Sequence, residues 1–137
     1  MAKESGLGMT VSVDDSAGSA QAIGNDITSC SWTMPSGVQD VTGINSSAME
    51  RLLLLADLTF TFTGVFNDAA SMSHAVFKNY RTLPGTELGR TTTLVHSGQT
   101  LADTILYTDF SFNRGQDGSL VWTAPGAMSD GTVPAWS

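Results

Sequence analysis

Residues 58–63 read Leu-Thr-Phe-Thr-Phe-Thr, a strict alternation of apolar and threonine side chains. Successive side chains of a strand point to opposite faces, so this period of two predicts a strand with one face in the core and one face polar. Phenylalanine and threonine also favour extended backbone. The preceding run, residues 49–55, favours helix by composition, but it is short and leads directly into the alternation. We therefore expect residues 50–66 to be largely extended, with a bend near Ala56 and Asp57.

Shorter strand patterns lie on both sides of this segment. Met9, Val11 and Val13 alternate with polar residues and predict an early strand. A second strand is expected from Ile27 to Met34, because Pro35 follows it. Three further strands, with hairpin-like turns between them, are expected near residues 90–97, 100–113 and 119–125.

A single helix is expected between Asp68 and Leu83. Its apolar residues recur at spacings of three and four and form one stripe, with Asp68 or Ser71 as the expected cap and Pro84 after the end. The stripe consists of Met72, Val76, Tyr80 and Leu83. One amphipathic helix needs a sheet to cover. The prediction is a mainly β (α+β) fold: a β-sandwich or half-barrel of two packed sheets, or one strongly curved sheet, flanked by one α-helix.

Two segments stand apart from this pattern. The chain begins with polar, glycine-bearing residues, and we predict an N-terminal arm over residues 1–15. Residues 36–50 mix Gly, Ser, Asp and Asn with a few Val and Ile, and they predict a long inter-strand loop. Loops of this length inside compact domains are usually functional. At 137 residues the chain is predicted to form a single domain, residues 1–137.

Composition and charge exclude several classes of protein. Six basic and 13 acidic residues give a net charge of −7, which argues against nucleic-acid binding, since phosphate contacts need clustered cations. The single cysteine, Cys30, excludes an internal disulfide framework and suits a reducing cytoplasm. The strongly apolar run from Leu52 to Ala56 is too short to span a bilayer, and the first residues lack the apolar core of a signal peptide. We expect a soluble protein.

No pattern in the sequence predicts catalysis. His74 and His96 have no partners at a recognisable triad spacing. Two separate histidines and one cysteine do not make a zinc site by local spacing, and no phosphate-binding glycine loop occurs. Cys30 alternates within a predicted strand and is interpreted as a small core residue. We therefore expect no enzyme, and no catalytic, cofactor-binding or metal-binding residue.

Several stretches together resemble the tail tube (major tail) protein family of siphophages. They are Asp40 to Leu52, Gly64 to Asp68, Ser97 to Leu101, Asp117 to Trp122 and Asp130 to Pro134. The order of elements is the stronger signal: arm, strands, long loop, long strand, helix, strands. The resemblance extends from about Asp14 to Trp136.

This resemblance implies a structural virion protein. Six copies would form a ring with a continuous inner β-barrel, and the rings would stack into a tube that carries the phage genome during ejection. The partners would be other copies of the chain and other tail proteins, assembled in the host cytoplasm. DNA would pass through the lumen without specific binding, and no cofactor is implied.

Two sets of residues are candidates for roles in such a tube. Acidic residues that flank or lie in the strand region would face the lumen and repel phosphate: Glu87, Asp103, Asp109 and Asp117. Residues of the arm and of the long loop would contact a neighbouring ring: Asp14, Asp15, Val38, Asp40, Val41 and Ile44.

Two other functions stay open at this point. One is the tube subunit of a contractile or phage-derived injection particle, or a tail completion protein. The other is a monomeric β-sandwich module that binds carbohydrate or a receptor, which surface exposure of Trp32, Trp122 or Trp136 would favour.

Overall fold

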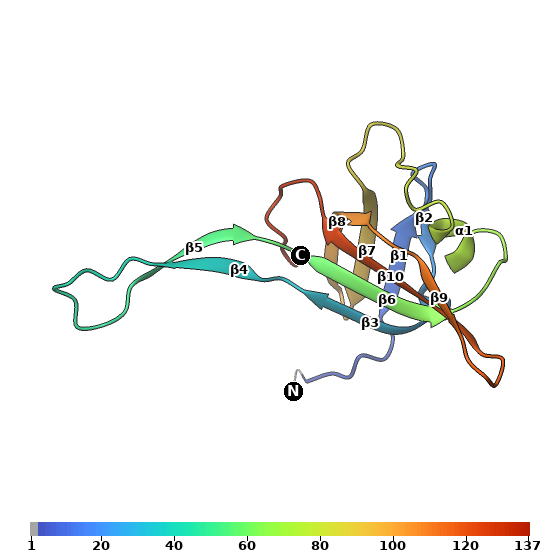
Figure 1. Ribbon diagram of the computed structural model, residues 1–137, viewed down its shortest axis with the longest axis horizontal. Helices are drawn as coiled ribbons and strands as arrows, with labels where there is room; N and C mark the ends of the chain where they lie inside the picture. The colour runs from blue at the N-terminus through green and yellow to red at the C-terminus, as the bar shows by residue number, and fades with distance from the viewer. Residues whose placement is uncertain (1–2) are drawn as a thin grey trace.

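The computed structural model describes residues 3–137 and consists mainly of one antiparallel sheet (Figure 1). Its strands follow the order β2-β1-β7-β8-β10-β6-β3, and β9 pairs with β10. They are β1 (Thr10–Asp14), β2 (Ala20–Ala22), β3 (Ile27–Thr33), β6 (Thr59–Val65), β7 (Arg90–His96), β8 (Gln99–Tyr107), β9 (Ser111–Arg114) and β10 (Leu120–Met128). A second sheet holds β4 (Ser36–Asp40) and β5 (Arg51–Ala56). The helical elements are a short 3₁₀ turn, η1 (Gly24–Asp26), and one helix, α1 (Ser73–Phe77).

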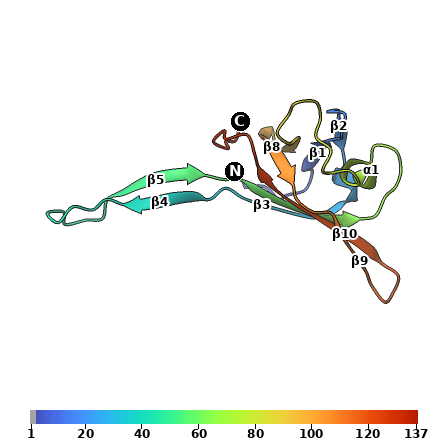
Figure 2. The same ribbon diagram turned by 45° about the horizontal axis from the view of Figure 1, so that its top comes forward.

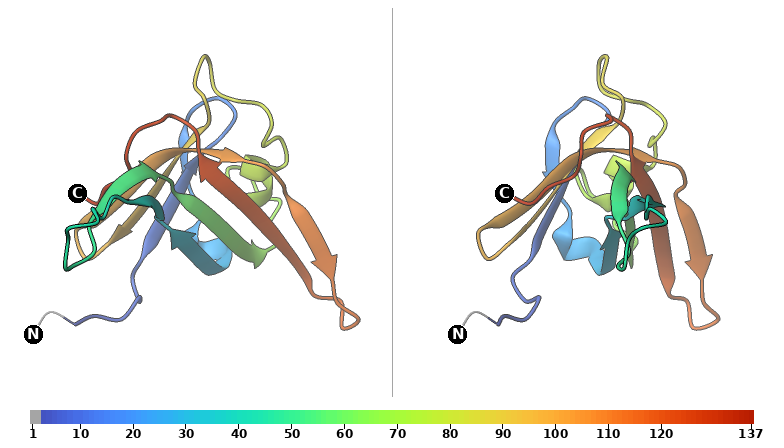
Figure 3. Two further views of the ribbon diagram at one scale, coloured as in Figure 1. Left: turned by 60° about the vertical axis from the view of Figure 1, so that its left-hand side comes forward. Right: turned by 90° about the vertical axis from the view of Figure 1, so that its left-hand side faces the viewer.

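The large sheet is bent into a trough, and α1 lies on its concave side (Figure 3). The predicted mainly β fold with one flanking helix is confirmed. Of the arrangements left open by the sequence, the body is a single strongly curved sheet. The second sheet is a hairpin that extends away from the body (Figure 1).

Strand β6 lies between β10 and β3, and its alternation sets the two faces of the sheet. Phe60 and Phe62 are buried with their rings 5.5 Å apart, while the threonines that alternate with them point to the other face. Phe62 lies opposite Ala124 on β10 and Cys30 on β3. The predicted strand and the bend after β5 are confirmed.

The core fills the concave side of the sheet. Trp122 is fully buried, its ring centroid is 5.2 Å from that of Phe77, and its indole N–H donates to the backbone oxygen of Val65 at 2.8 Å. Gly64 makes this packing possible, because a Cβ there would collide with the backbone oxygen of Asp26 and with the Trp122 ring.

The helix is much shorter than the sequence predicted. The prediction of a helix over residues 68–83 is wrong, since α1 covers only Ser73–Phe77. Neither Asp68 nor Ser71 caps the helix, because the N-cap residue is Met72 and no side chain makes a capping hydrogen bond there. Ser71 has a left-handed backbone conformation, with a φ of 65°. A helix of five residues is not stable alone, so tertiary contacts must hold it.

Two distant charged side chains hold the ends of this helix. The buried Asp26 accepts a hydrogen bond from the Ser73 backbone N–H at 3.0 Å, which replaces a local cap. The fully buried Arg90 guanidinium donates to the backbone oxygen of Val76 in the helix and to those of Asn79 and Thr82 beyond its end. The following segment therefore leaves the helix and folds over β7.

The predicted arm and loop are each divided by the structure. Residues 3–9 precede the sheet, but residues 10–14 form β1, which pairs with β7. Within the predicted loop, residues 36–40 form β4, which pairs with β5, and residues 41–50 connect the two strands. The predicted strand over residues 100–113 is broken into β8 and β9.

Replacing the fully buried Val76 by Asp should unfold the protein, because it places an unpaired carboxylate in the core. The expected loss exceeds about 4 kcal/mol, and thermal unfolding followed by circular dichroism measures it. Lys78→Asp, at an exposed position just after the helix, is the matched control and should unfold nearly as the unsubstituted chain does. A soluble Val76→Asp protein with an unchanged midpoint would show that this face of the helix is not the core face.

Candidate functional site

The hairpin of β4 and β5 projects from the body as a thin two-stranded arm (Figure 2). Its register pairs Val38 with Leu53 and Asp40 with Arg51. At the tip, Asp40 accepts hydrogen bonds from the N–H and the hydroxyl of Thr42, at 2.9 and 2.6 Å, and these bonds lower the pKa of Asp40. The Glu50 N–H donates to the Thr42 hydroxyl at 2.8 Å. The predicted loop is thus an ordered hairpin whose tip is closed by its own polar groups.

Both faces of this hairpin carry exposed apolar side chains. Leu53 is 78% exposed and Leu55 is 90% exposed, and they lie on the same face of β5 as Arg51. Leu52 and Leu54, on the opposite face, are each more than half exposed. An isolated two-stranded hairpin is marginal in water, and a contiguous exposed apolar surface usually marks an interaction site. We call the face with Val38, Leu53 and Leu55, which also carries the cross-strand pair Asp40 and Arg51, the apolar hairpin face.

The structure separates the six predicted contact residues into two groups. Val38 and Asp40 lie on β4 and Val41 and Ile44 in the connection that follows, so these four share the hairpin. Asp14 and Asp15 lie at the turn between β1 and β2, on the far side of the body (Figure 1). Burial, and after it the nearby Glu87, raises the pKa of Asp14.

The four predicted lumen-facing acidic residues lie on separate segments. Asp103 is on β8 and nearly buried, and burial raises its pKa, as does the neighbouring Asp130. Glu87 lies in the exposed connection before β7, and Asp109 between β8 and β9. Asp117 lies in the turn between β9 and β10, where hydrogen bonds from Ser119 lower its pKa. No single sheet face carries all four.

The convex face of the sheet is uncharged along its central strands. Strand alternation and the observed register place Thr, Ser, Ala, Val, Leu or Pro at each outward position of β7, β8, β10, β6 and β3. Threonine dominates: the outward residues include Thr33, Thr59, Thr61, Thr63, Thr91, Thr93, Thr104 and Thr123. We call this surface the threonine face.

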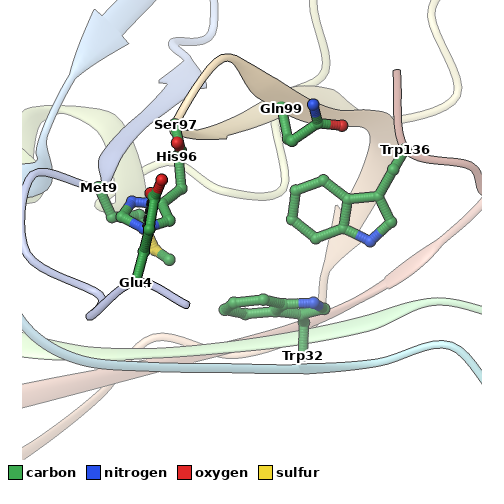
Figure 4. A pocket seen from close by; sticks show the side chains of 7 residues that line it. All are labelled: Glu4, Met9, Trp32, His96, Ser97, Gln99 and Trp136. Atoms are coloured by element: carbon green, nitrogen blue, oxygen red, sulfur yellow. Dashed lines mark ion pairs between the residues drawn. The ribbon is translucent and has the colours of Figure 1, made fainter. Parts of the chain in front are cut away.

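A cavity of about 650 Å³ opens beside Trp32, near the end of the strand that leads into the hairpin (Figure 4). Trp32, at the end of β3, and Trp136, near the C-terminus, form one end of it, with ring centroids 6.1 Å apart and planes inclined by 59°. His96 and Glu4 form the other end, with the His96 Nε2 3.9 Å from a Glu4 carboxylate oxygen. Trp136 is held by a bridge to Leu101 on β8. We call this cavity the tryptophan pocket.

His74 and Cys30 lie in apolar surroundings away from this pocket. His74 packs among three phenylalanine rings, the nearest of which, Phe66, lies 4.8 Å away. Burial raises the pKa of the Cys30 thiol to about 11, so the thiol is neutral at pH 7 and a poor nucleophile. Within residues 3–137 there is no group of three His, Cys, Asp or Glu side chains placed to hold a metal ion. Over the same residues, no helix has the length and apolar character to cross a membrane.

Comparisons with known proteins place the fold. No protein-family model matches the chain, and no curated protein matches it by sequence. Among solved structures, the chain matches one from the tail of an empty gene transfer agent (GTA) particle, determined with C6 symmetry. The TM-score is 0.73, the identity 16%, and 98% of each chain is covered. A chain from the virion of a native gene transfer agent particle matches with a TM-score of 0.72 and 14% identity, over 98% of this chain and 99% of the other.

The chain has the fold of these particle proteins. The match covers nearly the whole chain, so the hairpin is included in the shared fold. It confirms the fold that the family resemblance implied, and siphophages in particular are not singled out by it.

Proposed function

We propose that this chain is a tail tube subunit, whose copies form hexameric rings that stack into a conduit for DNA. The observation that carries the proposal is the hairpin, which exposes leucines on both faces that the monomer leaves unburied. Apolar surface is stabilised by removal from water, so the hairpin is suited to an assembled state in which another copy covers it. The matched structures are parts of a tail and of a virion, and the tail was determined with C6 symmetry.

The geometry of the subunit suits repeated head-to-tail contact. The hairpin leaves the body at one side, and the sheet has open edges at β2 and β3. A projection on one surface that fits a different surface of the next copy generates a closed ring or an open filament, depending on the rotation between copies. A tube of stacked rings needs a contact that closes each ring and a contact that repeats along the tube. Strand edges that pair with neighbouring copies are also no longer free to pair with other chains and aggregate. Together with the likeness to proteins of a tail and of a virion, this geometry supports a structural role in the tail.

We further propose that the threonine face lines the lumen. A surface of neutral hydroxyls gives DNA phosphates no cation to pair with, while the net charge of −7 disfavours adhesion elsewhere. Asp109 and Asp117 lie in the connections at either end of β9 and would add carboxylates at the rim of that face. Carboxylate repulsion acts over about 8 Å at physiological ionic strength, which suffices in a narrow channel. Asp103 is nearly buried and contributes least.

One observation favours a second function, a module that binds carbohydrate. Trp32 and Trp136 line an open pocket, and sugar-binding sites use such aromatic surfaces. Trp122, the third candidate, is fully buried and therefore excluded as a binding platform. The planes of the two remaining rings are inclined by 59°, so they offer no shared flat platform. The tube function accounts for both the hairpin and the fold, and the carbohydrate function accounts for neither.

The purified chain should form rings or tubes with a central channel as its concentration rises, observed by negative-stain electron microscopy. Deleting residues 40–48 should leave a folded monomer that forms no tubes, because the deletion removes the tip of the hairpin and not the core. A variant with Gly and Ser in place of residues 43–47 keeps the length of the hairpin. It separates the effect of the shortened hairpin from the effect of the lost side chains at its tip. Normal tubes from the deletion variant would contradict a role for the hairpin in assembly.

Replacing Thr61 by Lys should give tubes that retain duplex DNA at low salt and release it as salt rises, because a cation then faces the phosphates. Thr61 lies on β6 between the two buried phenylalanines, and its outward side chain leaves the core unchanged. Thr61→Glu is the matched control, with the opposite charge and no expected gain in DNA. Co-sedimentation of DNA with assembled tubes measures the difference. Equal DNA retention by the two variants would contradict the placement of this face in the lumen.

A further inference from the structure

The tryptophan pocket is open and largely apolar, and no segment of the chain over residues 3–137 fills it. Trp32, Trp136 and Met9 supply apolar walls, and Glu4 lies at the rim with its side chain 54% exposed. Its volume of about 650 Å³ is within the range of pockets that enclose a bound group of drug-like size, about 300–1,000 Å³. The pocket therefore has room for leucine-sized side chains from another molecule.

The apolar hairpin face has the complementary chemistry. Val38 and Leu53 are cross-strand partners and form a projecting apolar pair near the middle of the hairpin. Two positions before Leu53 on the same face is Arg51, an exposed cation that lies across the hairpin from Asp40 and makes no ion pair within residues 3–137. Basic residues are scarce in this chain, six against 13 acidic residues, so a cation beside exposed leucines is a distinctive feature.

We propose that the tryptophan pocket of one copy receives the apolar hairpin face of a second copy, with Leu53 and Val38 against Trp32 and Trp136 and Arg51 beside Glu4. The inference rests on the proposed assembly and names the contact that builds it. Two acidic chains repel each other at long range, so a specific contact between copies needs an apolar centre and a local pair of opposite charges. The pocket and the hairpin face together supply both.

Because the pocket lies at the opposite end of the hairpin from its tip, the same contact can be made again by each further copy. Strand β3 carries Trp32 near its end and leads through Pro35 into β4, so the pocket lies at the root of the hairpin (Figure 1). A hairpin seated in the pocket of the next copy leaves that copy's own hairpin free to do the same. Each copy then gives one hairpin and receives one, which is a heterologous contact that propagates.

Charge exchange tests the contact in the full chain. Glu4→Arg and Arg51→Glu should each raise the concentration needed for assembly about fivefold, and the double variant should return to within about twofold of the unsubstituted chain. Sedimentation over a concentration series measures this threshold, with circular dichroism to confirm folded monomers. The matched control pairs Arg51→Glu with Glu87→Arg and should show no rescue, because Glu87 is an exposed acidic residue before β7, whose other end carries the pocket residue His96.

Cross-linking tests the same contact by proximity. In a Cys30→Ser background, cysteines at Leu53 and Gln99 should join copies into a ladder on oxidation, seen on a denaturing gel, because Gln99 lines the pocket. Cysteines at Leu53 and Thr132 serve as the control, since Thr132 lines a separate hollow, and they should give no ladder.

The outcomes separate this contact from the proposed function. If the unsubstituted chain stays monomeric at every concentration, the assembly fails and this contact with it. If the chain assembles but the double variant shows no rescue and the Leu53–Gln99 pair gives no ladder, only the contact is wrong. Binding of a glycan to the pocket of assembled tubes, without loss of assembly, would also overturn it, because the pocket would then be free.

Discussion

The alternation of β6 is the constraint on which the rest of the structure depends. Its phenylalanines face the concave side and, with Trp122 and Phe77, form the centre of the core. Its threonines face the convex side and belong to the uncharged face. A shift of one residue in its pairing with β10 or β3 would exchange these two faces, so the core and the proposed lumen surface are determined by one register. The close approach at Gly64, where no Cβ fits, fixes that register further.

Period-two patterns in the sequence predicted most of the sheet, and they failed where tertiary contacts decide. The strands at β1, β3, β6, β7 and β10 follow local alternation and were predicted to within a few residues. The helix was not, because its ends are set by Asp26 and Arg90, which are distant in the chain. The apolar residues at three- and four-residue spacing around Val76 therefore predicted a helix of the right position and the wrong length.

The functional surfaces show the same division. The contact candidates in the predicted loop do lie together on the hairpin, because they are neighbours in the chain. The sequence predicted that the leucines of β5 are extended, but it did not predict that they are exposed. An unbroken apolar run is compatible with a strand that is buried on both faces and with one that is exposed on both. The tryptophan pocket was not predicted, since Glu4, Trp32, His96 and Trp136 come together only through the sheet and the C-terminal bridge. Apolar residues that stay exposed, such as these leucines, break the usual match between composition and burial, and such positions are expected to be functional sites.

In the proposed assembly, the hairpin is folded for the assembled state and contributes little to the monomer. Amide hydrogen exchange, compared between dilute monomer and assembled protein, tests it most directly. We expect fast exchange at Leu52 to Leu55 in the monomer and strong protection of the same amides after assembly, with β6 protected in both states. Equal exchange of the hairpin amides in the two states would contradict the claim.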